Sequence, residues 1–459
     1  MTWATRSSIL GLWVFFPAMS ALAQEKSSLK DALAIQEMIQ EAIKKAESSV
    51  ACILVSRERI PRDRIGAKLE DPDHIPDLYG SGVVIGTREG RGLILTNFHV
   101  VQGENPQFYV RLPGGKGSYA ERLAADYRSD LAVLELADPI AVQAIKMGNG
   151  DGVQKGQFVI SLANPFAAGF HDGSPSASWG IVSNLRRRAP GKQPTREGDR
   201  AKTTIHHLGT LLQIDARLNL GCSGGALLDL KGELIGLTSS QAAISGGETP
   251  GGYAVPMNSR VQKIVEQLRE GKEVSYGFLG VQFVPDNWPG QGVAVRVIPG
   301  SPIYRKVSNN DRVVIRAVDE IPLKDSDDLL YAIGTKMAGS NVKLEIVGMR
   351  EPITVTLQKL LAPGPFFASN KPPAVRGMRV DYGSIFAQRN LSSFEIPPGV
   401  FVTEIEPGSS AEKAKLKDAI ITHVNDQPVN TPAEFYRIAG QKLGSLKLRL
   451  YHGDEVRLD

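Results

Sequence analysis

The sequence predicts a mainly β protein of about three domains, and three observations carry this prediction. The chain has 459 residues, and a domain commonly holds about 150. It contains 47 glycines, about 10% of its residues against a usual ~7%, which indicates many turns. Its apolar residues occur mostly in short runs separated by Gly, Pro, Asn and Asp, a pattern typical of short antiparallel strands.

The composition excludes several classes of protein. Hydrophobic residues make up 42% of the chain and charged residues 22%, which is typical of a soluble globular protein and not of a disordered one. The net charge of +4, from 53 basic and 49 acidic residues, does not indicate a nucleic-acid binder. No P-loop occurs, and His206 and His207 lack a second ligand cluster, so we expect no cofactor and no metal site.

Residues 1–23 have the pattern of a secretory signal peptide. Arg6 is the single charge, residues 9–16 are almost wholly apolar, and Ala21-Leu22-Ala23 provides a small-x-small cleavage site. No later stretch approaches the roughly 20 apolar residues that span a bilayer. We expect a mature protein exported to the periplasm or another extracytoplasmic space, with no stable membrane span.

Residues 24–48 are predicted to form one amphipathic helix. Ser28 is a candidate N-cap, and the helix would run to Ala46. Its apolar positions follow helical spacing: Leu29, Leu33, Ile35, Ile39, Ala42, Ile43 and Ala46. This stripe needs a partner surface, either the following domain or a neighbouring subunit.

Residues 49–271 form the strand-rich domain. Its apolar runs predict strands at 50–55, 82–85, 92–96, 131–136, 158–160, 211–214 and 234–237. Strands at this spacing are typical of antiparallel barrels or sandwiches. Asn258 to Glu270 then predicts a helix that ends at Gly271.

Two similar modules follow, a first C-terminal module at residues 272–361 and a second at 374–459. Each contains a Gly-Val strand, a Pro-Gly-Ser turn, an Asp before an apolar strand, and a helix near Asp325 or Thr431. The same order in both indicates a repeat. Between them, residues 362–373 form a Pro-rich linker that proline holds extended.

Three short segments of the strand-rich domain carry candidate catalytic residues. His99 ends a strand, Asp130 begins one, and Ser223 lies in the glycine-rich turn 221–227. A serine hydroxyl needs a nearby base to become a nucleophile, and a carboxylate can orient an imidazole for that role. Glycines beside the serine let backbone N–H groups converge on an oxyanion. The chain order His, Asp, Ser is the chymotrypsin-type order.

Together these segments resemble the Deg/HtrA family of exported trypsin-like serine proteases. The strongest likeness runs from Gln213 through Gly221-Cys222-Ser223-Gly224-Gly225 to Gly236. The resemblance implies a chymotrypsin-like double β-barrel protease domain followed by two PDZ-like domains. It implies His99 as general base, Asp130 as its orienting carboxylate and Ser223 as nucleophile. The backbone N–H groups of Gly221 and Ser223 would form the oxyanion hole.

Cys222 departs from the family, which usually has asparagine before the serine. The frame Gly-x-Ser-Gly-Gly places Ser223, and not Cys222, in the nucleophile position. The Cys222 thiol can be a small buried group, or it can pair with Cys52, the single other cysteine of the chain. The sequence leaves both alternatives open.

PDZ domains bind a peptide C-terminus through backbone amides of a glycine-containing loop. The resemblance places these loops at Phe278-Leu279-Gly280-Val281 in the first module and at Arg376-Gly377-Met378 in the second. Arg376 stands at a position that is usually apolar, so it either adds positive charge near the carboxylate or points outward. Both modules lack the usual Gly-Asp pair, so the alternative is that one or both only pack against the rest of the protein.

The sequence therefore predicts an ATP-independent serine endopeptidase that acts on misfolded or unfolded proteins in envelope protein quality control. Its partners would be unfolded substrates and peptide C-termini, and the family resemblance implies a homotrimer or larger homo-oligomer. The alternative is a proteolytically weak PDZ scaffold or holdase chaperone, which Cys222 and the atypical turns motivate.

Overall fold

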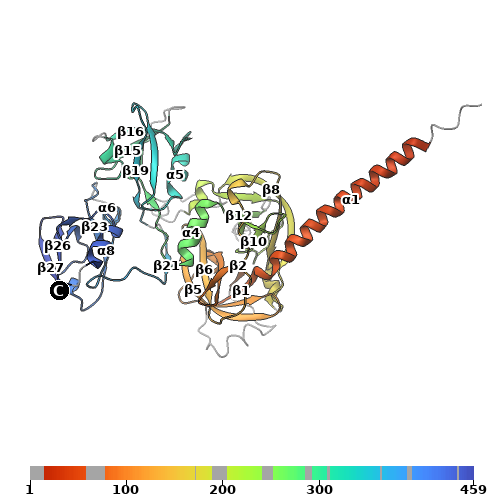
Figure 1. The fold of residues 1–459 in the computed structure, drawn as a ribbon, viewed down its shortest axis with the longest axis horizontal. Helices are drawn as coiled ribbons and strands as arrows, with labels where there is room; N and C mark the ends of the chain where they lie inside the picture. The colour runs from red at the N-terminus through yellow and green to blue at the C-terminus, as the bar shows by residue number, and fades with distance from the viewer. Residues whose placement is uncertain are drawn as a thin grey trace, which may run out of the picture.

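The computed structural model describes residues 15–57, 78–170, 172–188, 204–239, 252–284, 292–307, 311–361, 364–389, 395–441 and 444–459. Two closed six-stranded barrels form the centre of the molecule, and a two-stranded sheet and two open six-stranded sheets follow along the described part of the chain (Figure 1). The predicted mainly β fold and the chymotrypsin-like double barrel are both confirmed.

The first barrel has the strand order β5-β4-β1-β2-β3-β6 and closes through pairing of β5 with β6. All seven residues of its first strand are buried, since this strand lies between two neighbours in the barrel wall. Its strands are β1 (Val50–Ser56), β2 (Leu78–Arg88), β3 (Arg91–Asn97), β4 (Gln107–Leu112), β5 (Lys116–Asp126) and β6 (Leu131–Leu136).

The second barrel has the order β10-β11-β12-β9-β8-β7 and closes through β10 and β7. Its strands are β7 (Phe158–Ala163), β8 (Ser176–Arg187), β9 (Leu211–Ile214), β10 (Ala226–Leu228), β11 (Leu234–Ser239) and β12 (Gly252–Pro256). Helix α4 (Ser259–Arg269) follows, with Asn258 as N-cap and Gly271 in the left-handed region at φ +72°. Short 3-10 turns lie at 47–49, between the N-terminal helix and β1, and between strands at 98–100, 150–152, 165–170 and 205–208.

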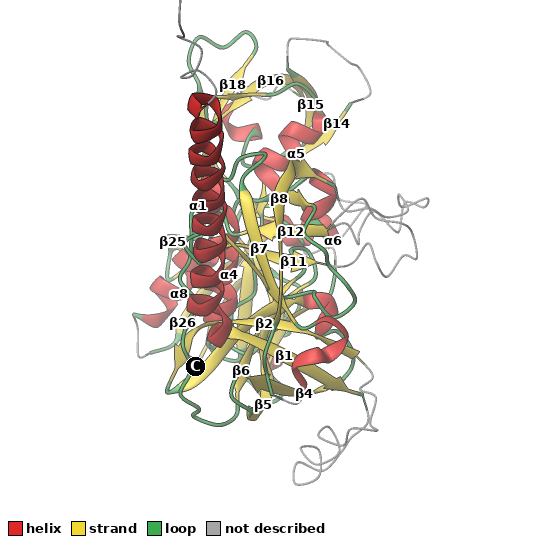
Figure 2. Cartoon of the chain, turned by 90° about the vertical axis from the view of Figure 1, so that its right-hand side faces the viewer, coloured by secondary structure: helices red, strands yellow, loops and turns green. Residues whose placement is uncertain are grey.

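Helix α1 (Phe15–Ala46) is longer than the sequence predicted and projects from the barrels (Figures 1 and 2). Ser28 lies inside this helix and is not its N-cap. No Gly or Pro interrupts residues 18–46, and Pro17 lies in the first turn, where its missing N–H costs nothing. The expected cleavage point after Ala23 falls within α1, and residues 1–14 of the expected signal peptide lie outside the described residues.

The C-terminal end of α1 packs on the barrels. Ala42 and Ala46 are 0% and 1% exposed and belong to the apolar core that also contains α4 and strands of both barrels. The small side chains matter because the backbone of Ala42 lies against Gly232, where an added Cβ would come within 2.9 Å of the Ala42 carbonyl oxygen. Farther along α1, Leu29, Leu33 and Met38 are exposed.

The two C-terminal modules contain sheets of the same topology. The first has the order β14-β15-β16-β18-β19 with β17 on β16, and the second β22-β23-β24-β26-β27 with β25 on β24. First-module elements are β13 (Gly277–Phe278), β14 (Val281–Phe283), β15 (Val293–Val297), β16 (Arg312–Val318), β17 (Ile321–Pro322), α5 (Ser326–Gly334), β18 (Asn341–Ile346), β19 (Ile353–Thr356) and β20 (Gln358–Lys359). Second-module elements are β22 (Met378–Tyr382), α6 (Gly383–Arg389), β23 (Val400–Ile405), α7 (Ser410–Lys413), β24 (Ile420–Val424), β25 (Gln427–Pro428), α8 (Pro432–Gly440), β26 (Leu446–Leu450) and β27 (Glu455–Leu458).

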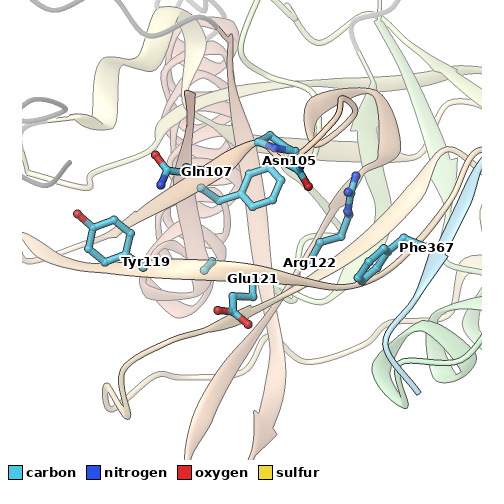
Figure 3. A pocket seen from close by; sticks show the side chains of 9 residues that line it. Asn105, Gln107, Tyr119, Glu121, Arg122 and Phe367 are labelled. Carbon is cyan, nitrogen blue, oxygen red and sulfur yellow. The ribbon is translucent and has the colours of Figure 1, made fainter. Parts of the chain in front are cut away.

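The Pro-rich linker contains a strand that the sequence did not predict. Strand β21 (Phe366–Ala368) pairs antiparallel with β5 of the first barrel, at Ala124 to Asp126. Phe367 lies beside Arg122, whose guanidinium carbon is 4.8 Å from the ring centroid. Figure 3 shows both side chains at a cavity of about 320 Å³, which none of the three candidate catalytic residues lines.

We expect Ala42→Asp to destabilise the protease domain, because it buries an unpaired carboxylate in the core shared by α1 and the barrels. The expected cost is about 3 kcal/mol or more, which lowers the melting temperature by roughly 6–12 °C. Thermal unfolding followed by circular dichroism measures it. Gln40→Asp, on the exposed side of the same helix turn, is the control. Equal melting temperatures for both variants would show that α1 does not pack as described.

Candidate active site

His99 and Asp130 form a hydrogen-bonded pair between the ends of two strands. His99 follows β3, and Asp130 immediately precedes β6. The His99 Nδ1 lies 2.8 Å from Asp130 Oδ2 and 3.0 Å from Oδ1. Since the carboxylate accepts, the Nδ1 carries the proton, and Nε2 of the neutral ring is the basic nitrogen.

The backbone around Asp130 is held by several hydrogen bonds. Asp130 has a φ of +54°, a left-handed conformation that costs energy in a non-glycine residue. Its carbonyl accepts from Phe98 N–H and from the Asn97 side-chain amide, at 2.9 and 3.0 Å. Its Oδ1 also accepts from the His99 backbone N–H at 3.0 Å. These bonds stabilise the strained turn and fix the carboxylate against the imidazole.

A second layer of buried polar groups supports this turn, and sequence reasoning missed it. His206 is 2% exposed, and its Nε2 donates to the Ser129 carbonyl at 2.9 Å. The Ser129 N–H and hydroxyl both donate to the Asp126 carboxylate, which also accepts from the Tyr276 hydroxyl at 2.5 Å. Burial raises the pKa of Asp126 and Tyr276. In the sequence, His206 next to His207 is a pattern relevant only to metal binding, and it does not indicate that His206 supports the turn at Asp130.

The turn that carries Ser223 lies against the first barrel. Gly221 and Gly224 have φ of +95° and +85°, and a Cβ on Gly224 would lie 2.1 Å from the Ser81 carbonyl oxygen. Ser81 N–H donates to the Ser223 carbonyl at 2.8 Å. Thr238 holds the other side, because its hydroxyl donates to the Cys222 carbonyl at 2.6 Å. Glycine is therefore required at 224, since the turn touches strand β2 there.

The orientation of the Leu220–Gly221 peptide follows from one hydrogen bond. The Leu220 carbonyl accepts from Phe166 N–H at 2.7 Å. The C=O and N–H of a trans peptide point in opposite directions, so the Gly221 N–H points away from Phe166. Among the described residues, no backbone carbonyl accepts a hydrogen bond from this N–H.

His99 Nε2 is buried and has no hydrogen-bond partner among the described residues. The Ser223 hydroxyl therefore does not bond to it in this structure, although the pairing of His99 with Asp130 is complete. Catalytic hydrogen bonds are often loose without substrate and tighten when it binds. The triad consequently stays a prediction, with two of its three groups in bonding contact.

Both cysteines are free thiols and both are buried, so the disulfide alternative is not realised in this structure. Burial raises the pKa of the Cys52 thiol to about 12 and also raises the pKa of the Cys222 thiol. The Cys222 sulfur accepts a hydrogen bond from Asn219 N–H at 3.3 Å. A protonated buried thiol is a poor nucleophile, which disfavours Cys222 in that role.

The two candidate carboxylate loops have matching backbones. Gly280 and Gly377 have φ of +84° and +82°, and an added Cβ would lie 2.1 and 2.0 Å from the Cβ of Ser301 and Ser409. Leu279 and Met378 are buried, whereas Phe278 and Val281 are partly exposed. Arg376 donates to the Gly444 carbonyl at 2.6 Å, so its guanidinium is tied to the module's own backbone.

Comparisons with known proteins identify relatives of this chain. A family described as "Trypsin-like peptidase domain" matches residues 80–237. The periplasmic pH-dependent serine endoprotease DegQ of Escherichia coli is 29% identical over 391 residues, which cover 82% of this chain and 78% of DegQ. The periplasmic serine endoprotease DegP of Salmonella typhimurium is 28% identical over 388 residues, with 82% and 74% covered.

This chain is a homologue of the Deg/HtrA serine endoproteases. The fold agrees with that of a solved variant of the HtrA-type protease AlgW with a decapeptide. The TM-score is 0.51 at 24% identity, and the match covers 71% of this chain and 99% of that one. No helix among the described residues of this Deg/HtrA homologue is long and apolar enough to cross a membrane.

The buried His206 makes a testable contribution to acid sensitivity. Burial lowers its pKa below the usual 6.5, while Asp130 opposes this shift and His207 and His99 add to it. The unfolded chain binds a proton as pH falls through about 6.5, and the folded protein does not, so the free energy of unfolding decreases on acidification. One such group contributes up to about 1.4 kcal/mol per pH unit until the native pKa is reached.

We expect the melting temperature of the wild type to fall more steeply between pH 7 and 5 than that of His206→Gln. The glutamine amide can still donate to the Ser129 carbonyl but does not titrate in this range. Identical pH slopes for the two proteins would contradict the assignment of a neutral buried His206.

Proposed function

We propose that this protein is an exported, ATP-independent serine endopeptidase that hydrolyses misfolded or unfolded proteins in envelope protein quality control. Its relatives are named periplasmic serine endoproteases, and it carries a trypsin-like peptidase domain. The observation that best supports the proposed residue roles is the His99–Asp130 pair, whose Nε2 has no hydrogen-bond partner among the residues that the structure describes. Nothing in the relatives' names favours the scaffold or holdase alternative.

In the proposed mechanism, Ser223 Oγ attacks the carbonyl carbon of the scissile peptide bond while His99 Nε2 takes its proton. Asp130 stabilises the imidazolium that forms. The negative oxygen of the tetrahedral intermediate accepts from the N–H groups of Gly221 and Ser223. His99 then protonates the leaving amine, the C–N bond breaks, and an acyl-enzyme remains. Water, deprotonated by His99, hydrolyses this ester and regenerates Ser223.

We include export and oligomer formation in the proposal. The N-terminal pattern at residues 1–23 supports export, as do the periplasmic relatives. A homotrimer or larger homo-oligomer would use α1, where Leu29, Leu33 and Met38 are 62%, 47% and 43% exposed. Leu29 and Leu33 are four residues apart and lie on one face of α1, and exposed apolar side chains placed in this way are typical of a helix that packs against another surface.

Ser223→Ala tests the protease assignment. We expect casein degradation by the purified protein to fall by at least about 10³-fold, because the nucleophile is removed. Cys222→Ser is the matched control, since it changes the adjacent buried thiol and should keep the rate within about threefold. Equal rates for the wild type and Ser223→Ala would refute the proposal. Suppression of client aggregation together with no wild-type turnover would support the chaperone alternative instead.

The proposed peptide-carboxylate loops make a separate prediction. We expect fluorescently labelled peptides with a free C-terminal carboxylate to bind the Ser223→Ala protein at least about tenfold more tightly than their amidated forms. Gly280→Ala and Gly377→Ala each push a methyl group into a serine Cβ of one module. Their separate effects on fluorescence polarisation assign binding to the first or second module. Equal affinity for acid and amide would exclude carboxylate recognition.

A further inference from the structure

Ser81 on strand β2 makes four hydrogen bonds near the Ser223 turn. Its side chain is 0% exposed. The hydroxyl donates to the Gly221 carbonyl at 2.8 Å and accepts from Asn164 N–H at 2.8 Å. Its backbone N–H donates to the Ser223 carbonyl at 2.8 Å, and its carbonyl accepts from the Thr96 hydroxyl at 2.7 Å. Ser81 belongs to the first barrel, whereas Asn164, Gly221 and Ser223 belong to the second.

The hydroxyl holds the Gly221–Cys222 peptide directly. A carbonyl that accepts a buried hydrogen bond cannot rotate without leaving that bond unmade, at a cost of about 1–3 kcal/mol. The Ser223 carbonyl is held by the same residue through its backbone N–H. Ser81 of strand β2 therefore fixes the orientation of both the Gly221–Cys222 peptide and the Ser223–Gly224 peptide.

The same hydroxyl acts indirectly on the Leu220–Gly221 peptide. It accepts a hydrogen bond from Asn164 N–H and so holds the segment in which Phe166, two residues later, donates its N–H to the Leu220 carbonyl. Phe166 and Ala167 have φ of +52° and +55°, so this segment is strained and depends on its anchors. Gly221 also fits tightly here, since a Cβ would lie 2.6 Å from the Asn164 carbonyl oxygen. Both peptide planes of Gly221 thus depend on Ser81.

We propose that the Ser81 hydroxyl is a positioning residue that orients the Gly221 N–H of the oxyanion hole by linking strand β2 to the Asn164 and Gly221 backbones. The inference rests on the proposed function of Ser223 and Gly221. Ser81 does not touch the substrate. It acts through the backbone of the turn that carries Gly221 and Ser223. It lowers the energy of those states in which the substrate oxygen is negatively charged.

Ser81→Ala tests this role. Hydrolysis of a chromogenic peptide should show kcat per folded protein lower by about 10- to 100-fold, less than the 10²–10³-fold loss when an oxyanion donor itself is removed. KM should change by less than about threefold, because the ground-state carbonyl depends little on the hole. A peptide boronate, which forms a tetrahedral adduct with the serine, should bind the variant more weakly by a factor similar to the kcat loss.

Two further variants separate positioning from simple stability. Ser118→Ala also removes a buried hydroxyl from the first barrel, but Ser118 bonds to the Tyr119 carbonyl and to Asp138, away from the Ser223 turn. We expect it to keep the wild-type kcat and boronate affinity. Ser81→Thr retains the hydroxyl donor and should keep kcat within about fivefold of the wild type. Folded fraction and melting temperature are measured for each variant.

A Ser81→Ala variant with wild-type kcat and boronate affinity per folded molecule would overturn the proposal, even if its melting temperature fell. A folded Ser81→Thr variant as slow as Ser81→Ala would also overturn it. These failures are distinct from failure of the proposed function, which would appear as equal activity of the wild type and Ser223→Ala.

Discussion

The apolar contact between the two barrels is the interaction on which the candidate site depends. His99 and Asp130 come from the first barrel, and Ser223 comes from a turn of the second. A single buried core joins the barrels and α4, with members such as Val83, Leu95, Leu131, Ile160, Leu162, Leu237 and Ile264. Burying apolar surface stabilises by about 25 cal/mol per Å² but is not directional. It brings the two halves of the site together without specifying their relative orientation.

Hydrogen bonds across the barrel contact supply that orientation. Ser81 is the clearest case, since one residue of β2 bonds to three backbone groups of the second barrel. His206 is another, because it follows β8 yet donates to the carbonyl before Asp130. Buried hydrogen bonds add little net stability but are costly to break, so they select one arrangement among many apolar contacts.

The first C-terminal module is joined to the segment that precedes Asp130. The Tyr276 hydroxyl bonds to Asp126, and the Arg128 guanidinium lies 4.9 Å from the Tyr276 ring centroid. Arg128 also donates to the Gly334 carbonyl at the end of α5. On the neighbouring surface, Arg186 pairs with Asp328 and Arg188 with Asp327. Together with β21, these contacts place the ends of β5 and its following turn against elements that come much later in the chain.

Much of this protein could be predicted from its sequence. The strands at 131–136 and 211–214, the helix capped by Asn258, and the helices starting after Asp325 and Thr431 all lie where the sequence placed them. Turn residues, caps and apolar spacing act over a few residues, so they can be read along the chain. The candidate residues His99, Asp130 and Ser223 were found in the same way, from short motifs and their order.

Only the tertiary structure decided what acts over long sequence distances. Ser81 carried no signal in the sequence, and only the structure shows that its partners are Asn164, Gly221 and Ser223. Pairing of β21 with β5 joins residues about 240 positions apart, which linker composition cannot predict. The sequence likewise left open whether Cys52 and Cys222 form a disulfide, whereas in the structure both are buried free thiols. Residue type and spacing thus identified the candidate catalytic groups, whereas packing determined how they are held, because contacts between distant segments leave no local pattern.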